Sequence, residues 1–171
     1  EKGLEPRANE IFEQKKDSKD PLIMAEAFIN TENGVETAAD ALQGAMDIIA
    51  ENISDDAGIR KRLRVVAMAQ SILCAKAADE NTDSVYRQYY DYHEPVAKVA
   101  SHRILAIDRG EKEEFLKVSV DFDINKALNI VCSTVLKPNS PCTETVRLAA
   151  EDAYGRLIFP SIEREIRNEL T

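Results

Sequence analysis

The chain has little cysteine, histidine or glycine, and these three shortages exclude several kinds of site. The three cysteines, Cys74, Cys132 and Cys142, are widely spaced and odd in number, unlike a disulfide framework. His93 and His102 are too far apart in the sequence to place two zinc ligands on adjacent turns of one helix. We therefore expect neither a structural metal ion nor a bound cofactor.

Long apolar runs and glycine-rich phosphate loops are also missing. No stretch approaches the roughly 20 apolar residues of a membrane span, and the amino end lacks the apolar core of a signal peptide. The glycines are scattered, and neither a nucleotide-binding loop nor a Gly-x-Ser-x-Gly nucleophile elbow occurs. The sequence predicts a cytoplasmic protein that is not an enzyme and does not contact a membrane.

What the chain does contain is a normal share of core-forming residues and an excess of acid. Of its 171 residues, 44% are hydrophobic and 31% are charged, which is enough to bury a core. Asp and Glu outnumber Lys and Arg by 31 to 22, a net charge of −9, and residues 1–60 carry 14 of these acids. This charge repels nucleic acid, so we expect weak nucleic-acid binding by this chain. Because it lacks an initiator methionine and stops within a helical pattern, we expect a piece of a longer protein.

Hydrophobic periodicity predicts helices over most of the chain. Thr37 resembles a capping residue before the clearest helix, whose apolar stripe extends to Ile53. Ser54, Asp55 and Asp56 then favour a long helix that continues to about residue 78. Further helices are expected over residues 6–16, from Pro21, over 101–109 and 124–136, and over 143–170 with a bend or break at Pro160.

One segment, residues 115–122, has the two-residue period of a strand. Leu116, Val118, Val120 and Phe122 alternate with polar residues. A lone strand is not stable, so its partner is either an unrecognised segment of this chain or lies outside it. The predicted fold class is mainly α, a multi-helix assembly with one short strand segment near 115–122.

The most basic short segment is the candidate nucleic-acid site. It contains Arg60, Lys61, Arg62 and Arg64, which could contact phosphates. On a helix these side chains spread over more than half of the circumference, so a solvated face paired with neighbouring acids is the alternative.

Two other clusters have a functional and a structural interpretation. Tyr86, Tyr89 and Tyr90 share one face of a predicted helix, and tyrosines at this spacing stack on bases less often than they pack in a core. The segment Ser101-His102-Arg103 begins a predicted helix closed by Gly110, where capping and ion pairing account for these residues without a ligand.

Five segments spread over the chain form motifs longer than any short pattern. They are residues 1–6, 40–51, 90–94, 101–113 and 152–171. Together they resemble the family of the bacterial transcription accessory protein Tex. The departures are Ala100, where the family usually has proline, Asp108, where asparagine is common, and Gly155, where a basic residue is usual.

The resemblance implies a multi-domain cytoplasmic protein related to a eukaryotic transcription elongation factor, with an RNase H-like domain, helix-hairpin-helix repeats and an S1 domain that binds nucleic acid. This chain would cover a helix-turn-helix-like unit at residues 1–65 and a helical region at residues 66–171 that leads into the RNase H-like domain. No catalytic residue of the family falls on it. We therefore expect a non-catalytic helical scaffold of a Tex-like nucleic-acid-binding protein. The alternative is a protein-interaction module that docks on the transcription machinery without direct nucleic-acid contact.

Overall fold

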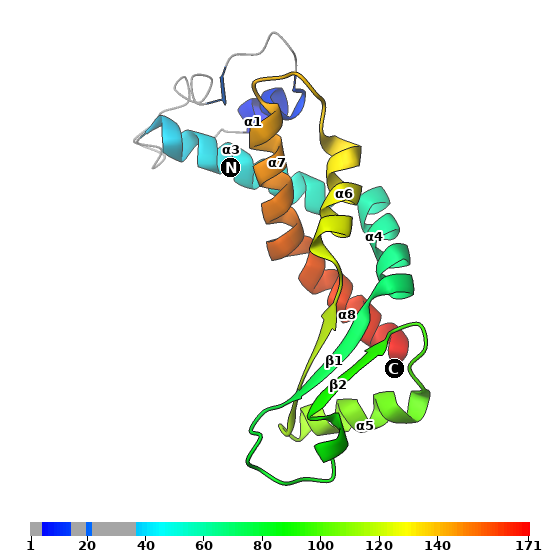
Figure 1. Cartoon of the computed structure of the whole chain (residues 1–171). Helices are drawn as coiled ribbons and strands as arrows, with labels where there is room; N and C mark the ends of the chain where they lie inside the picture. Colours follow the sequence, from blue (N-terminus) through cyan, green and yellow to red (C-terminus); the bar gives the residue numbers. More distant parts are fainter. Residues whose placement is uncertain (1–4, 15–19, 22–36) are drawn as a thin grey trace. The chain divides into compact units, whose positions relative to one another are not determined.

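The computed structural model describes residues 5–14, 20–21 and 37–171 (Figure 1). Packing divides the chain into two compact units. The first, which we call the helical unit, lies within Glu1–Arg60 and Leu128–Phe159, and the second, which we call the sheet unit, comprises Lys61–Ala127 and Pro160–Thr171. The divisions fall inside helices α4 (Ala57–Gln70) and α6 (Ile124–Val135) and at the start of α8 (Phe159–Leu170), so each unit is built from segments far apart in the sequence.

The helical unit is centred on α3 (Ala38–Ser54), which packs against α1 (Glu5–Phe12) and α7 (Thr143–Asp152). The α3 helix begins at Thr37, whose hydroxyl oxygen accepts a hydrogen bond from the Asp40 backbone N–H at 3.0 Å. Small residues allow the helices to approach closely, since several alanines are fully or almost fully buried: Ala8, Ala41, Ala45, Ala149 and Ala150.

A buried glutamine connects two segments of the helical unit. Gln14 is 2% exposed, and its amide nitrogen donates to the Val135 carbonyl at 2.7 Å. Its side-chain oxygen accepts from the Lys137 backbone N–H at 2.8 Å. The side chain therefore satisfies backbone groups at the end of α6 that would otherwise lack partners, as burial of a polar group requires.

The last helical stretch widens before it becomes α8. Residues Ala153–Ile158 form the π-helical segment η3, in which the Phe159 N–H bonds to the Tyr154 carbonyl. Pro160 follows immediately and has no N–H to donate to the Arg156 carbonyl, so regular α-helical bonding cannot continue through this point. The predicted bend or break near Pro160 takes the form of this wider turn.

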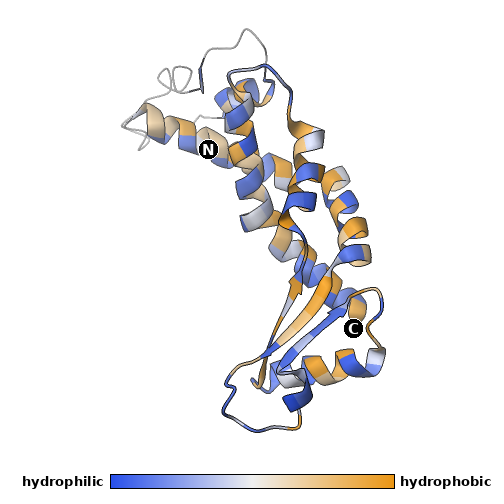
Figure 2. Ribbon diagram, in the orientation of Figure 1, coloured by the Kyte–Doolittle hydropathy of each residue, from blue (hydrophilic) through white to orange (hydrophobic). Residues whose placement is uncertain are grey.

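The sheet unit contains three antiparallel strands in the order β2-β1-β3. They are β1 (Ile72–Ala77), β2 (Asp91–Pro95) and β3 (Leu116–Asp121). In the central strand, Leu73 faces Glu94 and Val120, and Ala75 faces Tyr92 and Val118. Figure 2 shows a mostly hydrophobic β1 beside a hydrophilic β2, as expected for a central strand and an edge strand.

Helix α5 (Ser101–Lys112) packs against β3 and buries Ile104 and Ile107. A Cβ atom at Gly110 would lie 2.6 Å from the Leu116 Cδ1 atom, so only glycine allows this approach without a shift. Helix α5 continues past Gly110 to Lys112, so the prediction that Gly110 ends the helix is wrong. The short 3₁₀ helix η2 (Arg87–Tyr89) lies between β1 and β2 in the sequence and contacts both strands.

The mainly α fold, the Thr37 helix, the strand near 115–122 and the helix over 124–136 are confirmed. The long helix predicted to reach residue 78 is wrong, because it ends at Gln70 and residues 72–77 form β1. The strand predicted near 115–122 therefore pairs with β1, which lies in a segment that the sequence analysis predicts as helix. The predicted helix beginning at Pro21 lies almost entirely outside the described residues.

Candidate functional site

The four basic residues of the candidate nucleic-acid site lie on α4 but meet different surroundings. The Arg60 side chain donates to the Ser54 carbonyl oxygen, at the carboxyl end of α3. The Arg64 guanidinium lies 4.0 Å from the Glu165 carboxylate. Lys61 and Arg62 are exposed. The helix thus spreads the four side chains around its circumference and engages Arg60 and Arg64 with acceptors of this chain.

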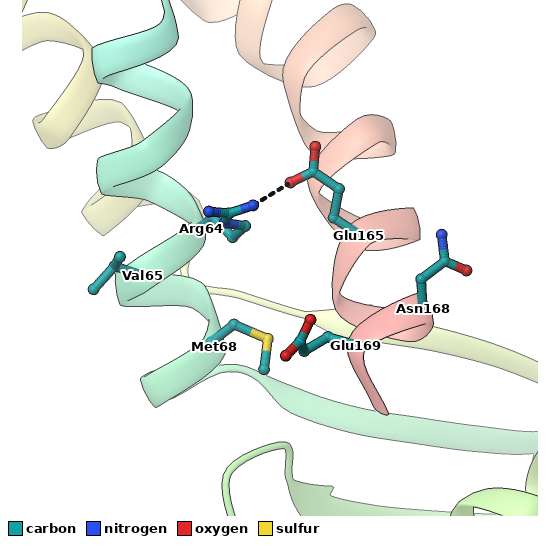
Figure 3. Close-up of a pocket in the computed structure, with 6 residues that line it drawn as sticks. All are labelled: Arg64, Val65, Met68, Glu165, Asn168 and Glu169. Atoms are coloured by element: carbon teal, nitrogen blue, oxygen red, sulfur yellow. Dashed lines mark ion pairs between the residues drawn. The ribbon is translucent and has the colours of Figure 1, made fainter. Parts of the chain in front are cut away.

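A groove lies between α4 and α8 in the sheet unit (Figure 3). It encloses about 610 Å³ and is lined by Arg64, Val65, Met68, Glu165, Asn168 and Glu169. Figure 3 shows that the first three come from α4 and the others from α8, with Met68 and Glu169 pointing toward one another. Since α8 follows α4 in the sequence by about 100 residues, sequence periodicity alone could not bring these side chains together.

The chemistry of this groove is apolar at α4 and acidic at α8. Val65 is 60% exposed and Met68 is partly exposed. Glu165 and Glu169 give the groove more negative than positive charge, because Arg64 is the one basic residue among the described residues that line it. The Arg64–Glu165 pair is itself solvent-exposed and contributes less than about 1 kcal/mol. The groove therefore suits an apolar side chain flanked by basic groups better than a phosphate.

Arg167 fixes α8 to α5 on another side of the sheet unit. Its guanidinium lies 2.9 Å from an Asp108 oxygen and 2.7 Å from a Glu111 oxygen. Burial lowers the pKa of Arg167, but the hydrogen bonds that its guanidinium donates to Glu111 and Asp108, and the negative charges of these two groups, outweigh burial, so the pKa is raised. A polar pocket of about 430 Å³ adjoins these groups. Five of its lining side chains already bond to one another or to the backbone: Asp108, Glu111, Glu163, Arg167 and Thr171.

A side chain of α8 also forms a hydrogen bond with the outer edge of β3. The Glu163 carboxylate accepts a hydrogen bond from the Val120 backbone N–H at 2.8 Å. An acidic side chain thus satisfies an edge-strand donor that would otherwise face water or another chain. Arg167 and Glu163 together assign a structural role to this side of α8.

The tyrosine segment is mainly a packing element. Tyr86 and Tyr89 are each 6% exposed, and Tyr89 meets Tyr92 edge to face with ring centroids 5.3 Å apart. The packing interpretation is therefore confirmed for these two rings, although they lie on η2 and the adjoining loop and not on a longer helix. The Tyr86 hydroxyl donates to the Glu113 carboxylate, which raises the pKa of Tyr86.

The segment Ser101-His102-Arg103 begins α5 as predicted, but not through the predicted cap. The capping position is Ala100, and no side chain bonds to the helix start there. Arg103 pairs with Glu94 of β2 at 3.2 Å, which confirms ion pairing for this residue. His102 is exposed.

The described residues offer no metal-binding cluster. Within residues 5–14, 20–21 and 37–171, no three His, Cys, Asp or Glu side chains gather as a metal site requires. Cys74 and Cys142 are buried, and burial raises the pKa of the Cys74 thiol and of the partly exposed Cys132 thiol. None of the helices in this part of the chain is long and apolar enough to cross a membrane.

Comparison with known proteins gives a consistent family. Residues 16–171 match the family described as Tex central region-like. The chain is 41% identical to the uncharacterized protein YdcI of Bacillus subtilis over 99% of its own length and 24% of that protein. It is 33% identical to protein tex of Bordetella pertussis over 93% of its length and 19% of that protein.

A more distant relative is the transcription elongation factor SPT6 homolog of Arabidopsis thaliana, at 26% identity over 99% of this chain and 11% of that protein. The chain therefore spans about a quarter or less of the length of these relatives. The matched residues include the whole sheet unit and the part of the helical unit that follows residue 15. The chain belongs to the Tex family and corresponds to its central region.

Proposed function

We propose that this chain is a non-catalytic scaffold in a Tex-like transcription accessory protein, and that the groove between α4 and α8 is a docking site for a protein segment. One observation carries the proposal: an exposed valine and a methionine lie beside two glutamates in a groove of about 610 Å³. The occupant that fits this chemistry is a helical or extended segment with an apolar side chain flanked by lysine or arginine. Its apolar side chain would cover Val65 and Met68, and its cations would meet Glu165 and Glu169.

Nucleic-acid contact through Arg60, Lys61, Arg62 and Arg64 is the second candidate function. The exposure of Lys61 favours it, because this side chain can reach a phosphate. The net charge of −9 opposes it, and so does the engagement of Arg60 with Ser54 and of Arg64 with Glu165. We therefore propose that this chain binds nucleic acid weakly and that other parts of the full-length protein supply the main contacts.

The organisation proposed for the parent protein follows the family. The helix-turn-helix-like unit at residues 1–65 and the helical region at 66–171, leading into an RNase H-like domain, remain predictions, as does the cytoplasmic location. Residues 15–19 and 22–36 of the first region lie outside the described residues. The names of the relatives, a transcriptional accessory protein Tex and an SPT6 transcription elongation factor, support a role in transcription.

The groove can be tested with a labelled 15-residue amphipathic peptide that carries leucine on one face and lysine on the other. We expect Val65→Gln combined with Met68→Gln to weaken peptide binding about tenfold, measured by fluorescence anisotropy. Val85→Gln is the matched control, because Val85 is 85% exposed in the loop after β1. Equal binding by the wild type and the double variant would contradict the groove proposal.

Nucleic-acid binding is tested separately with a labelled 20-nucleotide RNA and a labelled DNA duplex of the same sequence. We expect only weak binding by the wild type at physiological salt. Replacing Arg60, Lys61, Arg62 and Arg64 with glutamine should lower both the affinity and its dependence on salt. Submicromolar binding would overturn the assignment of weak contact, and an unchanged salt dependence would place the contact elsewhere.

A further inference from the structure

Helix α5 sorts its charged side chains by direction. Its buried face contains Ile104 and Ile107. Asp108 and Glu111 lie on one flank, where both pair with Arg167. The opposite, solvent-facing side contains His102, Leu105, Arg109 and Lys112, which fall within about 80° of the circumference at 3.6 residues per turn. We call these four residues the α5 stripe.

The cations of the α5 stripe are left without acidic partners because the neighbouring acids are used elsewhere. On a helix, Asp108 is placed to pair with Lys112 and Glu113 with Arg109, since each pair is four residues apart. Asp108 instead accepts hydrogen bonds from Arg167 and Thr171, and Glu113 accepts one from the Tyr86 hydroxyl. Within the described part of the chain, neither Arg109 nor Lys112 forms an ion pair.

An exposed apolar side chain lies in the middle of these cations. Leu105 is 61% exposed, although it belongs to a helix whose opposite face is buried against the sheet. Phosphates would neutralise Arg109 and Lys112 but would leave Leu105 in contact with water. A protein segment with both carboxylates and an apolar side chain would satisfy all three residues.

We propose that the α5 stripe is a docking surface for an acidic amphipathic helix of a partner protein. The stripe spans His102 to Lys112, about 15 Å along the helix axis, which matches a partner helix of about ten residues. One apolar residue of the partner packs on Leu105, and its glutamates or aspartates meet Arg109 and Lys112. This surface has the opposite charge to the groove between α4 and α8, so the two sites select different partners.

The direct test uses a labelled 15-residue helical peptide with leucine on one face and glutamate on the other, added to the isotopically labelled 171-residue chain. We expect chemical-shift changes concentrated in residues 101–113. Leu105→Gln should lower the affinity for the peptide about fivefold, and Arg109→Gln combined with Lys112→Gln should lower it about tenfold, because each variant removes one part of the complementary surface. A version of the peptide with glutamine in place of leucine should bind about as weakly to the wild type as the parent peptide binds to Leu105→Gln.

Matched controls lie outside the sheet unit. Leu148 is 48% exposed on α7 and Lys137 is exposed in the loop before it, so Leu148→Gln and Lys137→Gln should leave the affinity unchanged. The groove variant Val65→Gln with Met68→Gln should also bind normally, which separates this proposal from the groove. The proposal is overturned if the acidic peptide does not bind, if it binds equally well without leucine, if its shift changes lie outside 101–113, or if an oligonucleotide occupies the stripe at lower concentration.

Discussion

The helical unit and the sheet unit bury their cores in different ways. In the helical unit, α3 meets its neighbours through alanines such as Ala41, Ala45 and Ala149, so the helix backbones come close together. In the sheet unit, large buried side chains contribute from several elements, such as Leu73 of β1, Ile107 of α5 and Ile166 of α8. Both proposed docking surfaces, the groove and the α5 stripe, belong to the sheet unit.

The two units also differ in charge. The segments of the helical unit hold 17 acidic and 9 basic side chains, whereas those of the sheet unit hold 14 acidic and 13 basic ones. Because the sheet unit has nearly equal numbers of acidic and basic side chains, their local arrangement decides the charge of each part of its surface. Glu165 and Glu169 line the groove, whereas Arg109 and Lys112 lie on the α5 stripe, and this placement gives surfaces of opposite sign on one small unit.

The largest expected effect tests whether the two cores are energetically separate. Ile49 and Ile166 are at most 1% exposed, one in each unit. Ile49→Ala and Ile166→Ala should each lower the free energy of unfolding by about 3 kcal/mol through lost burial and a residual cavity. By hydrogen exchange, we expect the first to reduce protection mainly in α1, α3 and α7, and the second mainly in the sheet and α8. Equal loss of protection in both units for either variant would contradict the division.

A pair of glycines gives the next effect. Gly110→Ala in the sheet unit should lower stability by about 1–3 kcal/mol, because the new Cβ would collide with Leu116 and crowd Tyr86, both buried. Gly155→Ala in the helical unit should raise stability by about 0.5–1 kcal/mol, because no atom lies within 4 Å of its Cβ position and alanine favours helix. Denaturant unfolding of both variants measures the contrast, and effects of the same sign would refute it.

Alkaline pH should affect the helical unit through Tyr154. Burial raises the pKa of Tyr154 to about 12, above the value of about 10 in an unfolded chain. The folded state therefore favours the neutral phenol, and this contribution is complete below pH 10 and disappears as the pH rises toward 12. As the pH rises from about 10 to about 12, the free energy of unfolding measured in urea should fall less for Tyr154→Phe than for the wild type. An identical decline in both proteins would show that Tyr154 is not responsible.

The smallest effect compares two helix starts. Thr37→Ala should cost about 1 kcal/mol, because it removes the side-chain acceptor for the Asp40 N–H at the start of α3. Ser101→Ala should change stability by less than about 0.5 kcal/mol, because no side chain caps α5. Thermal unfolding of the two variants against the wild type provides the measurement. A larger loss for Ser101→Ala would mean that its hydroxyl stabilises α5 in another way.

The sequence predicts those elements whose signals are local. Thr37 and the stripe up to Ile53 predict α3 because a cap and a 3.6-residue period act within a single segment. The alternation around Val118 predicts β3 for the same reason. Strand β1 escapes prediction because Ile72 and Leu73 continue the helical spacing of α4, and no glycine or proline marks the end at Gln70. Pairing with Val118 and Val120 selects the strand, a contact made more than 40 residues away.

The candidate sites were predictable to different extents. The basic residues of α4 are visible in the sequence, but Glu165, which pairs with Arg64, could not be assigned from local pattern. The α5 stripe was partly visible, since His102 and Arg109 share one side of the predicted helix. Its lack of acidic partners depends on Arg167 and Tyr86, which approach α5 from elsewhere in the chain. Residue type and spacing thus indicate candidate surfaces, and tertiary neighbours decide their net charge.

The π-helical turn η3 makes the register of the last helix sensitive to chain length. From Tyr154 onward, buried residues recur at every fourth position, through Ile158 and Ile162 to Ile166. Four residues of a regular α-helix advance by about 40° more than one turn, and the wider turn offsets part of this drift. Deleting Gly155 would restore ordinary bonding and rotate residues 159–170 by about 100° about their axis. The single residue Gly155 therefore determines whether Ile162 and Ile166 stay on the same side of this helical stretch as Tyr154 and Ile158.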